Sequence, residues 1–130
     1  MILAHGIDLV DVAHSRKLLA EPGGHWLARC FTLAEQEDAG TGHDRAERLS
    51  ARFAVKEAVM KALGTGFGKG VGFLSIEVLT TGDGPPAVRL HEEAARRAEA
   101  LGIRRWLVSA SHEGDFAIAS VIALGDQSPR

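Results

Sequence analysis

Residues 52–66 have the sequence RFAVKEAVMKALGTG, and this stretch decides the fold. Its pattern is that of the last turns of a helix that ends at Gly64 and continues into a glycine-rich loop. A spacing of four residues puts Glu57 and Lys61 on one helix face, with Gly64 beyond them on the same side. A carboxylate, an ammonium group and exposed backbone N–H groups would then surround one small volume, which suits a metal-bound phosphate. The alternative is that Glu57 and Lys61 form a solvated surface pair.

A long central helix contains this stretch. Asp44 and Glu47 form an acidic version of the capping box, which predicts a helix start there, and Gly64 predicts its end. At 1.5 Å per residue a helix over residues 44–63 is about 30 Å long, so it crosses the whole domain. Its buried stripe consists of apolar residues together with alanines that let a sheet approach closely: Leu49, Ala51, Ala54, Val55, Ala58, Val59, Ala62 and Leu63.

The other segments show strand patterns and shorter helix patterns. Strands are predicted over residues 2–10, 73–80, 86–90, 105–112 and 116–124, and helices over residues 12–20, 32–40 and 91–101. Thr32 and Glu35 have the spacing of a capping box, residues 25–31 form a short amphipathic turn, and residues 82–85 form a tight turn. We predict an α+β fold, a single domain over residues 1–124 in which a largely antiparallel sheet packs against the one long central helix. Residues 125–130 are predicted to be a flexible C-terminal tail.

The last predicted strand is apolar or small at every position, since residues 117–123 have the sequence AIASVIA. A strand of this kind is normally covered on both faces. The long helix covers one face, and few apolar helices are left for the other. A second subunit is the natural cover, so the chain is expected to form an oligomer.

Composition narrows the class of protein. The chain has 130 residues, a formal net charge of −2 and one cysteine, Cys30. This charge argues against a nucleic-acid binder held by bulk electrostatics, and one cysteine cannot form a disulfide framework. No apolar run is long enough to span a bilayer, and the first residues lack the features of a signal peptide. We expect a cytoplasmic protein that binds neither nucleic acid nor membrane.

Two further features indicate a metal or anion site. Asp8 lies in the apolar run of residues 2–10, where an acid is costly without a partner; it either serves as a cap or turn residue or coordinates a metal. The loop of residues 64–70 has glycines at alternate positions. It follows a helix, whereas Walker and Rossmann loops follow a strand, so both of those folds are excluded. What remains is a nest of N–H groups for an anion or a flexible connector.

Five short motifs, in this order and spacing, resemble one family over nearly the whole chain. They are GID at residues 6–8, FTLAE at 31–35, RFAVKEA at 52–58, KALGTG at 61–66 and VSASH at 108–112. This set resembles holo-acyl-carrier-protein synthase, the short class of 4′-phosphopantetheinyl transferase. The stretch of residues 52–66 is the specific part, because the first and last motifs would be weak alone.

The resemblance implies a reaction and an assembly. Coenzyme A would donate its phosphopantetheine arm to a serine of an apo acyl carrier protein, with adenosine 3′,5′-bisphosphate as the other product. It also implies Mg²⁺, a homotrimer, and active sites between subunits. The pathway that the carrier serves, fatty-acid, polyketide or another, is left open.

The resemblance also implies residue roles. Asp8 and Glu57 match the metal-binding positions, and Asp8, Glu57, Lys61 and His112 are the candidate catalytic residues. Glu57 would take the serine proton, directly or through a metal-bound water, and Lys61 would neutralise or protonate the departing phosphate. His112 would contact nucleotide phosphates or order a metal-bound water; alternatively it is a structural residue of a hairpin. The candidate coenzyme-binding residues are Arg52, Lys61, Gly64, Thr65, Gly66 and His112, with Arg52 as a bidentate phosphate fork.

The carrier-binding surface is less well matched. In the family, basic residues of the first helix meet an acidic helix of the carrier. The candidates here are His14, Arg16 and Lys17, with His14 where an arginine is expected, and Glu113 beside His112 has no assigned role. Two other classes of function stay open. One is a non-catalytic coenzyme A- or nucleotide-binding oligomer of the same fold, and the other is a purely structural oligomer.

Overall fold

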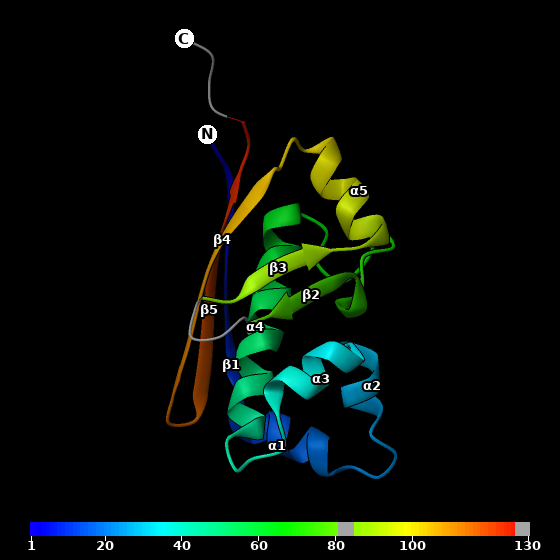
Figure 1. The fold of residues 1–130 in the computed structure, drawn as a ribbon, viewed down its shortest axis with the longest axis vertical. Coiled ribbons are helices and arrows are strands. Elements are labelled where there is room, and N and C mark those ends of the chain that lie inside the picture. The colour runs from blue at the N-terminus through cyan, green and yellow to red at the C-terminus, as the bar shows by residue number, and fades with distance from the viewer. Residues whose placement is uncertain (81–84, 127–130) are drawn as a thin grey trace.

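Helix α4 (Arg45–Leu63) is the centre of the molecule. In the computed structural model, which describes residues 1–80 and 85–126, α4 lies between two layers (Figure 1). One layer is a three-stranded antiparallel sheet in the order β1 (Ile2–Asp11), β5 (Phe116–Leu124), β4 (Arg105–Glu113). The other contains the antiparallel pair β2 (Ile76–Leu79) and β3 (Ala87–Leu90) with several helices. The predicted α+β fold with one long central helix is confirmed.

The shorter helices complete the second layer and the lower end of the molecule. They are α1 (Val12–Ala20), α2 (His25–Cys30), α3 (Leu33–Ala39), α5 (Glu92–Ala100) and the 3₁₀ turn η1 (Phe73–Ser75). No helix in the described part of the chain is both long and apolar enough to cross a bilayer. Two sequence predictions need correction. The segment predicted as a strand from residue 73 begins as the turn η1, and the predicted amphipathic turn from residue 25 is the helix α2.

Small residues bring the sheet directly onto α4. The β5 residues that face the helix are Ala117, Ala119, Val121 and Ala123, and all four are buried. On β1 the most restrictive position is Gly6, because a Cβ atom there would lie 1.9 Å from the carbonyl oxygen of Ala58. Only glycine therefore lets β1 run this close to α4.

The two ends of α4 follow the sequence signals unequally. The helix begins after Asp44 as predicted, but that side chain makes no capping bond; its Oδ2 accepts from Arg48 Nε at 2.8 Å instead. At the other end Gly64 has a φ of 75°, in the left-handed region. The Gly64 and Thr65 N–H groups donate to α4 carbonyls at 3.1 and 3.2 Å. The predicted glycine stop is thus confirmed.

A buried ion pair attaches the second layer to α4. Lys56 and Glu35 are both fully buried. Lys56 Nζ donates to Glu35 Oε1 at 2.8 Å and to the Phe73 and Ile76 carbonyls at 2.8 and 2.6 Å. Glu35 also completes the predicted capping box with Thr32, which is confirmed. Burial lowers the pKa of Lys56, and the Glu35 carboxylate opposes that effect. Every charge in this pair is compensated, so the pair fixes α3, η1 and β2 on the helix.

The outer face of the three-stranded sheet is apolar and open. Leu9 and Ile118 are paired across β1 and β5 and are 61% and 43% exposed. Further exposed apolar side chains lie on the same face: Ile7, Leu107 and Phe116. Among the described residues nothing covers this face, and Figure 1 shows it at one side of the molecule. In the single chain, the face of β5 that points away from α4 is therefore uncovered, as the sequence of residues 117–123 predicts.

The two predictions about turns and tail lie partly outside the described residues. Residues 82–84 of the predicted turn at residues 82–85 lie outside the described residues, as do residues 127–130 of the predicted tail. The described start of that tail is bonded to the first residue, since the Gly125 N–H donates to the Met1 carbonyl at 2.8 Å.

Candidate active site

Three of the predicted catalytic residues come together where β1 crosses α4. Lys61 Nζ donates to Asp8 Oδ1 and to the Ile7 carbonyl, both at 2.9 Å. The Asp8 side chain is 10% exposed and that of Lys61 is 54% exposed. Asp8 is two positions after Gly6 on the face of β1 that meets α4, so the contact at Gly6 sets the height of Asp8 over the helix. Lys61 thus pairs with Asp8 rather than forming the isolated surface pair with Glu57.

Glu57 completes a cluster of two carboxylates and one ammonium group. Burial raises the pKa of Glu57, the neighbouring Asp8 carboxylate raises it further, and Lys61 opposes the shift. On the Asp8 side chain, Oδ2 is buried and has no hydrogen-bond partner within the described residues. A buried acceptor without a donor beside a second carboxylate is unfavourable unless the two groups share a proton or a cation lies between them.

This donor set fits a hard cation such as Mg²⁺ better than zinc. Magnesium takes oxygen ligands and usually binds through one or two carboxylates, with the remaining positions filled by water and substrate phosphate. Asp8 and Glu57 supply those two carboxylates. In residues 1–80 and 85–126 no group of three His, Cys, Asp or Glu side chains could hold a metal ion, so an all-protein site of the zinc type is not present there.

The glycine loop follows directly after Lys61. Gly64 and Gly66 are exposed, with φ values of 75° and 55° that favour glycine. The N–H groups of Gly64 and Thr65 already donate to α4, and the Thr65 hydroxyl donates to the Gly66 carbonyl at 2.9 Å. The backbone N–H groups that remain for an anion therefore come after Thr65. The predicted anion-binding loop thus offers fewer free N–H groups than the sequence of residues 64–70 suggests.

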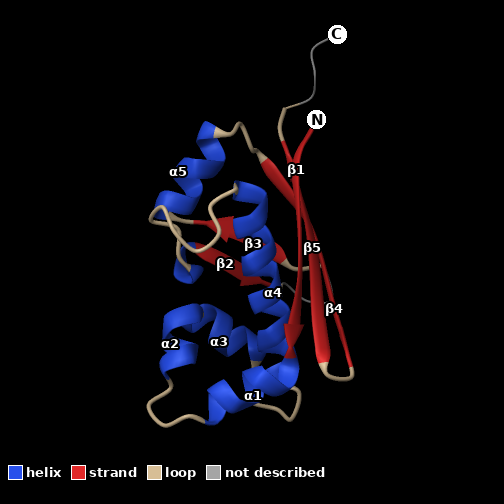
Figure 2. Ribbon diagram, turned by 180° about the vertical axis from the view of Figure 1, so that it is seen from behind, coloured by secondary structure: helices blue, strands red, loops and turns tan. Residues whose placement is uncertain are grey.

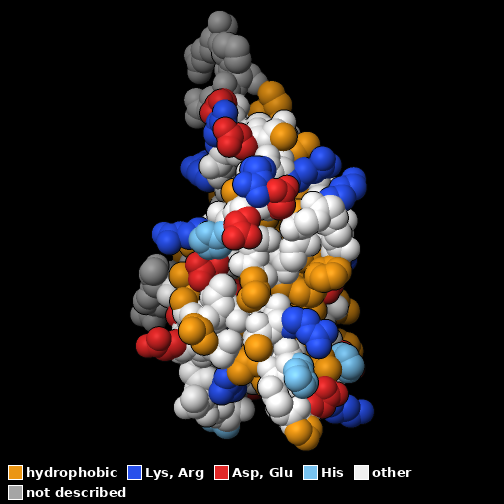
Figure 3. All heavy atoms as spheres, turned by 90° about the vertical axis from the view of Figure 1, so that its right-hand side faces the viewer, with side chains coloured by type: hydrophobic (Ala, Val, Ile, Leu, Met, Phe, Trp, Pro, Cys, Tyr) orange, Lys and Arg blue, Asp and Glu red, His pale blue; other side chains and the backbone are white. Residues whose placement is uncertain are grey.

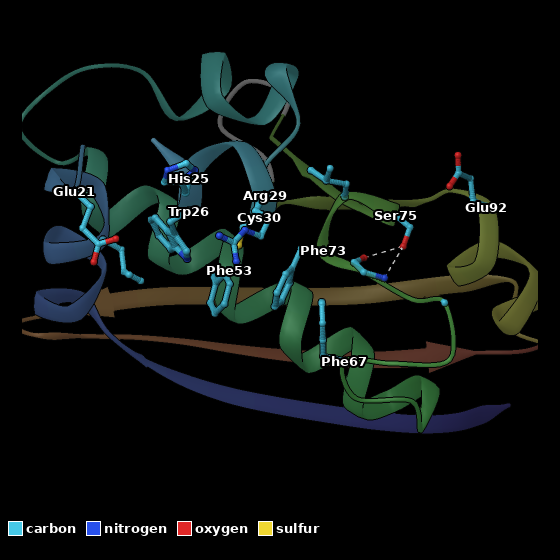
Figure 4. Close-up of a pocket in the computed structure, with 14 residues that line it drawn as sticks. Glu21, His25, Trp26, Arg29, Cys30, Phe53, Phe67, Phe73, Ser75 and Glu92 are labelled. Carbon is cyan, nitrogen blue, oxygen red and sulfur yellow. Dashed lines mark hydrogen bonds between the residues drawn. The ribbon is translucent and has the colours of Figure 1, made fainter. Parts of the chain in front are cut away.

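An aromatic cavity of about 600 Å³ lies between α2, α4 and η1, and none of Asp8, Glu57 and Lys61 lines it. Phe53, one helical turn before Glu57, lies in its wall, and Figure 4 shows Phe53, Phe73 and Phe67 following one another with Trp26 at one end. The Phe53–Phe73 and Phe67–Phe73 ring centroids are 4.9 and 5.2 Å apart. The cavity was not predicted from the sequence. The four-residue spacing of Phe53 and Glu57 does place an aromatic ring on the helix face that carries the Glu57 carboxylate.

Polar groups sit among the rings of this cavity. They include Glu21, His25 and Arg29 from the end of α1 and from α2. Figure 3 shows the side of the molecule on which α2 and α5 lie in Figure 1, with several hydrophobic side chains exposed at mid-height and basic and histidine side chains below them. Cys30 also lines the cavity, but burial raises the pKa of its thiol to about 11. The thiol therefore stays protonated and is no nucleophile at neutral pH.

Arg52 is placed away from the cluster. It is 6% exposed and forms an ion pair with Asp38 of α3. Its Nη1 donates to the Arg48 carbonyl at 3.0 Å, and its Nη2 approaches Thr80 Oγ1 at 3.4 Å. The hypothesis that Arg52 binds phosphate as an open fork is not supported, because its guanidinium is buried and engaged between α3, α4 and the end of β2.

His112 is also outside the cluster of its own chain. Asp8 shares a row of the sheet with Ala119 and Ala110, whereas His112 lies two positions further along β4, opposite Ala117. Two strand spacings separate β1 from β4, so His112 is about 10 Å or more from Asp8. Its side chain is exposed near the β4–β5 turn.

The three candidate carrier contacts lie on the exposed side of α1. His14, Arg16 and Lys17 are all exposed, but Arg16 forms an ion pair with Glu47 of α4. Within the described residues no ion pair involves Lys17. The basic character that α1 offers to an acidic partner therefore rests on Lys17 more than on Arg16.

Comparisons with known proteins point to one family. The profile described as "4'-phosphopantetheinyl transferase superfamily" matches residues 4–121. The holo-[acyl-carrier-protein] synthase of Chloroflexus aurantiacus is 45% identical, covering 94% of this chain and 98% of the relative. The crystal structure of the holo-[acyl-carrier-protein] synthase from Neisseria meningitidis superposes with a TM-score of 0.84 at 31% identity, covering 95% of this chain and 99% of the other. That of the Bacillus anthracis enzyme in complex with CoA (3′,5′-ADP) has a TM-score of 0.79 at 33% identity, covering 97% and 99%.

Proposed function

The chain belongs to the 4′-phosphopantetheinyl transferase superfamily, among the holo-[acyl-carrier-protein] synthases, and we propose how it carries out that reaction. Coenzyme A donates phosphopantetheine to a serine hydroxyl of an apo acyl carrier protein, and adenosine 3′,5′-bisphosphate leaves. The observation that carries this proposal is the cluster of Asp8, Glu57 and Lys61 beside an exposed glycine loop. A similar chain bound to coenzyme A supports the choice of donor.

Asp8 and Glu57 would hold Mg²⁺. The support is the unpartnered Asp8 Oδ2 and the raised pKa of the neighbouring Glu57 carboxyl. When bound, the ion would neutralise part of the negative charge on the pyrophosphate of coenzyme A. Asp8 Oδ2 would then gain a partner, in addition to the Lys61 ammonium group that already binds Oδ1.

The side chains of the cluster perform the transfer itself. The serine oxygen of the carrier attacks the phosphorus that bears the pantetheine arm, and the bond from that phosphorus to the bridging oxygen breaks. Glu57 receives the serine proton directly or through a water. Lys61, held over the site by Asp8 and the Ile7 carbonyl, stabilises the charge on the leaving phosphate.

The aromatic cavity provides the apolar surface of the site. Phe53, one turn before Glu57 on α4, and Phe73 of η1 form part of its wall. Apolar parts of a bound substrate would be buried in this cavity. The aromatic rings supply large contact areas with few rotatable bonds. On the carrier side, Lys17 and His14 of α1 would meet an acidic helix, with Arg16 contributing less because of Glu47.

The working unit is a homotrimer with active sites between subunits. Burial of the open sheet face, with Leu9 and Ile118 at its centre, supports association, and the number three rests on the family resemblance. Because His112 does not reach Asp8 in its own chain, His112 would enter the site from a neighbouring subunit.

The direct test is transfer to a carrier. The protein is incubated with coenzyme A, Mg²⁺ and an apo acyl carrier protein, and intact-mass spectrometry looks for the phosphopantetheine adduct on the carrier. The expected adduct disappears when a chelator replaces Mg²⁺. Binding of coenzyme A without any adduct would instead identify a non-catalytic binder.

A further inference from the structure

Arg97 of α5 lies against the end of α4 and the glycine loop. Its Nε donates to the carbonyl of Leu63, the last residue of α4, at 3.1 Å. Its Nη2 lies 3.7 Å from the position that a Cβ atom on Gly64 would occupy. Figure 2 shows the loop after α4 passing between the end of that helix and α5. The guanidinium therefore faces the backbone of an exposed, side-chain-free turn.

Most of this guanidinium is not used inside the fold. A guanidinium has five N–H donors in a planar fork, and within residues 1–80 and 85–126 only Nε of Arg97 makes a hydrogen bond. The neighbouring Arg96 is paired with Glu93, whereas no described acid pairs with Arg97. A half-buried arginine that forms no ion pair with a described acid, and whose Nη2 lies beside the glycine loop, is suited to an anionic ligand.

Capping of α4 alone does not account for this arrangement. A cation at a helix C-terminus is favourable, but the last carbonyls of α4 already accept from the Gly64 and Thr65 N–H groups. Arg97 Nε is the one donor that this arginine gives to the end of the helix, at the Leu63 carbonyl. The Nη groups of Arg97 make no hydrogen bond to a described residue. Because Gly64 has no side chain, the space between Nη2 and the backbone of Gly64 is open.

Lys61 and Arg97 approach the loop from different elements. Lys61 is held on the β1 side by Asp8 and the Ile7 carbonyl, and Arg97 stands on the α5 side. Coenzyme A carries two separate phosphate groups, the pyrophosphate and the 3′-phosphate. Two cations on either side of one glycine loop match a ligand with two anionic groups.

We infer that Arg97 is a donor-binding residue, whose two Nη groups hold a phosphate of coenzyme A against the Gly64–Gly66 loop. The inference rests on the proposed function for the identity of the donor. It assigns Arg97 to binding and orientation and gives it no part in proton transfer.

The test compares Arg97→Met with Arg96→Met, which removes the same charge one position away. Isothermal titration with adenosine 3′,5′-bisphosphate measures the Kd, and transfer assays measure KM and kcat with coenzyme A and with dephospho-coenzyme A. In Arg97→Met we expect the Kd and the KM for coenzyme A to rise at least about tenfold, as for a lost charged hydrogen bond, with kcat changed much less. Arg96→Met stays within about twofold of the parent.

The second donor identifies the phosphate. If Arg97 holds the 3′-phosphate, Arg97→Met raises KM for coenzyme A but not for dephospho-coenzyme A, and if it holds the pyrophosphate, both KM values rise. Arg97→Lys, which keeps the charge and loses the fork, should give an intermediate rise and is the decisive variant if Arg97→Met does not fold.

An unchanged Kd and KM in folded Arg97→Met, with or without a lower Tm, would overturn the inference and leave Arg97 as a helix cap only. A parent protein that binds the bisphosphate but transfers nothing would refute the proposed function, and the titration would still decide the role of Arg97.

Discussion

Replacing Gly6 by alanine tests how the site is positioned. The added Cβ atom would lie 1.9 Å from the Ala58 carbonyl oxygen, and real Cβ contacts are essentially never below 3.0 Å. The gap must therefore open by at least about 1.1 Å, and β1 can move because its other edge is unpaired within the described chain. Such overpacking costs roughly 1–3 kcal/mol, and the same movement stretches the 2.9 Å contact between Asp8 and Lys61.

The expected result is a folded but weakened enzyme. For a domain of this size roughly 4 °C of Tm is lost for each kcal/mol, and a displacement of about 1 Å at a catalytic group lowers turnover by about 10²-fold. Thermal melting followed by circular dichroism and transfer kinetics measure the two effects. Gly42→Ala is the matched control, because the nearest atom there is a movable side-chain oxygen of Asp44. If Gly6→Ala matches Gly42→Ala in Tm and turnover, the close contact does not position Asp8.

Three further predictions concern Lys61, Ile118 and Glu77. Lys61→Met should lower turnover by about 10²-fold in the transfer assay, and turnover within twofold of the parent would place leaving-group stabilisation elsewhere. Ile118→Glu should separate the subunits in size exclusion with light scattering, whereas an active monomer of the parent would remove the shared site. The Thr32 hydroxyl and then His91 lower the pKa of Glu77 below its ordinary 4.5, so its stabilisation exists above that value and disappears as pH falls through the lowered pKa. We therefore expect the free energy of unfolding in urea to fall less between about pH 6 and pH 3 for Glu77→Gln than for the parent protein. Equal falls in the two proteins would contradict a stabilising role of the Glu77 carboxylate.

Local sequence signals predicted local structure well. The capping box of Thr32 and Glu35 and the stop at Gly64 depend only on neighbouring residues, and both are confirmed. The beginning of α4 was predicted correctly, but its cap was not, because Arg48 competes for the Asp44 carboxylate.

Long-range pairing was not predictable in the same way. Glu35 and Lys56 are 21 residues apart, and nothing in the sequence shows that their charges meet in the core. Arg52 likewise had the character of a phosphate ligand until its contact with Asp38 was known.

The site was predictable mainly through its resemblance to a family. Asp8 and Lys61 lie 53 positions apart, and periodicity alone only placed Glu57 and Lys61 on one face. The roles of Gly6 and Arg97 depend on how close two elements pack, which no spacing in the sequence reveals.

The most direct test of the catalytic cluster is the turnover of Glu57→Gln. This substitution keeps the size of the side chain and removes the charge that would bind Mg²⁺ and accept the serine proton. Intact-mass spectrometry of the carrier, at saturating coenzyme A and Mg²⁺, should show transfer reduced by at least about 10²-fold while circular dichroism shows an unchanged fold. Adduct formation at the parent rate in folded Glu57→Gln protein would contradict the account.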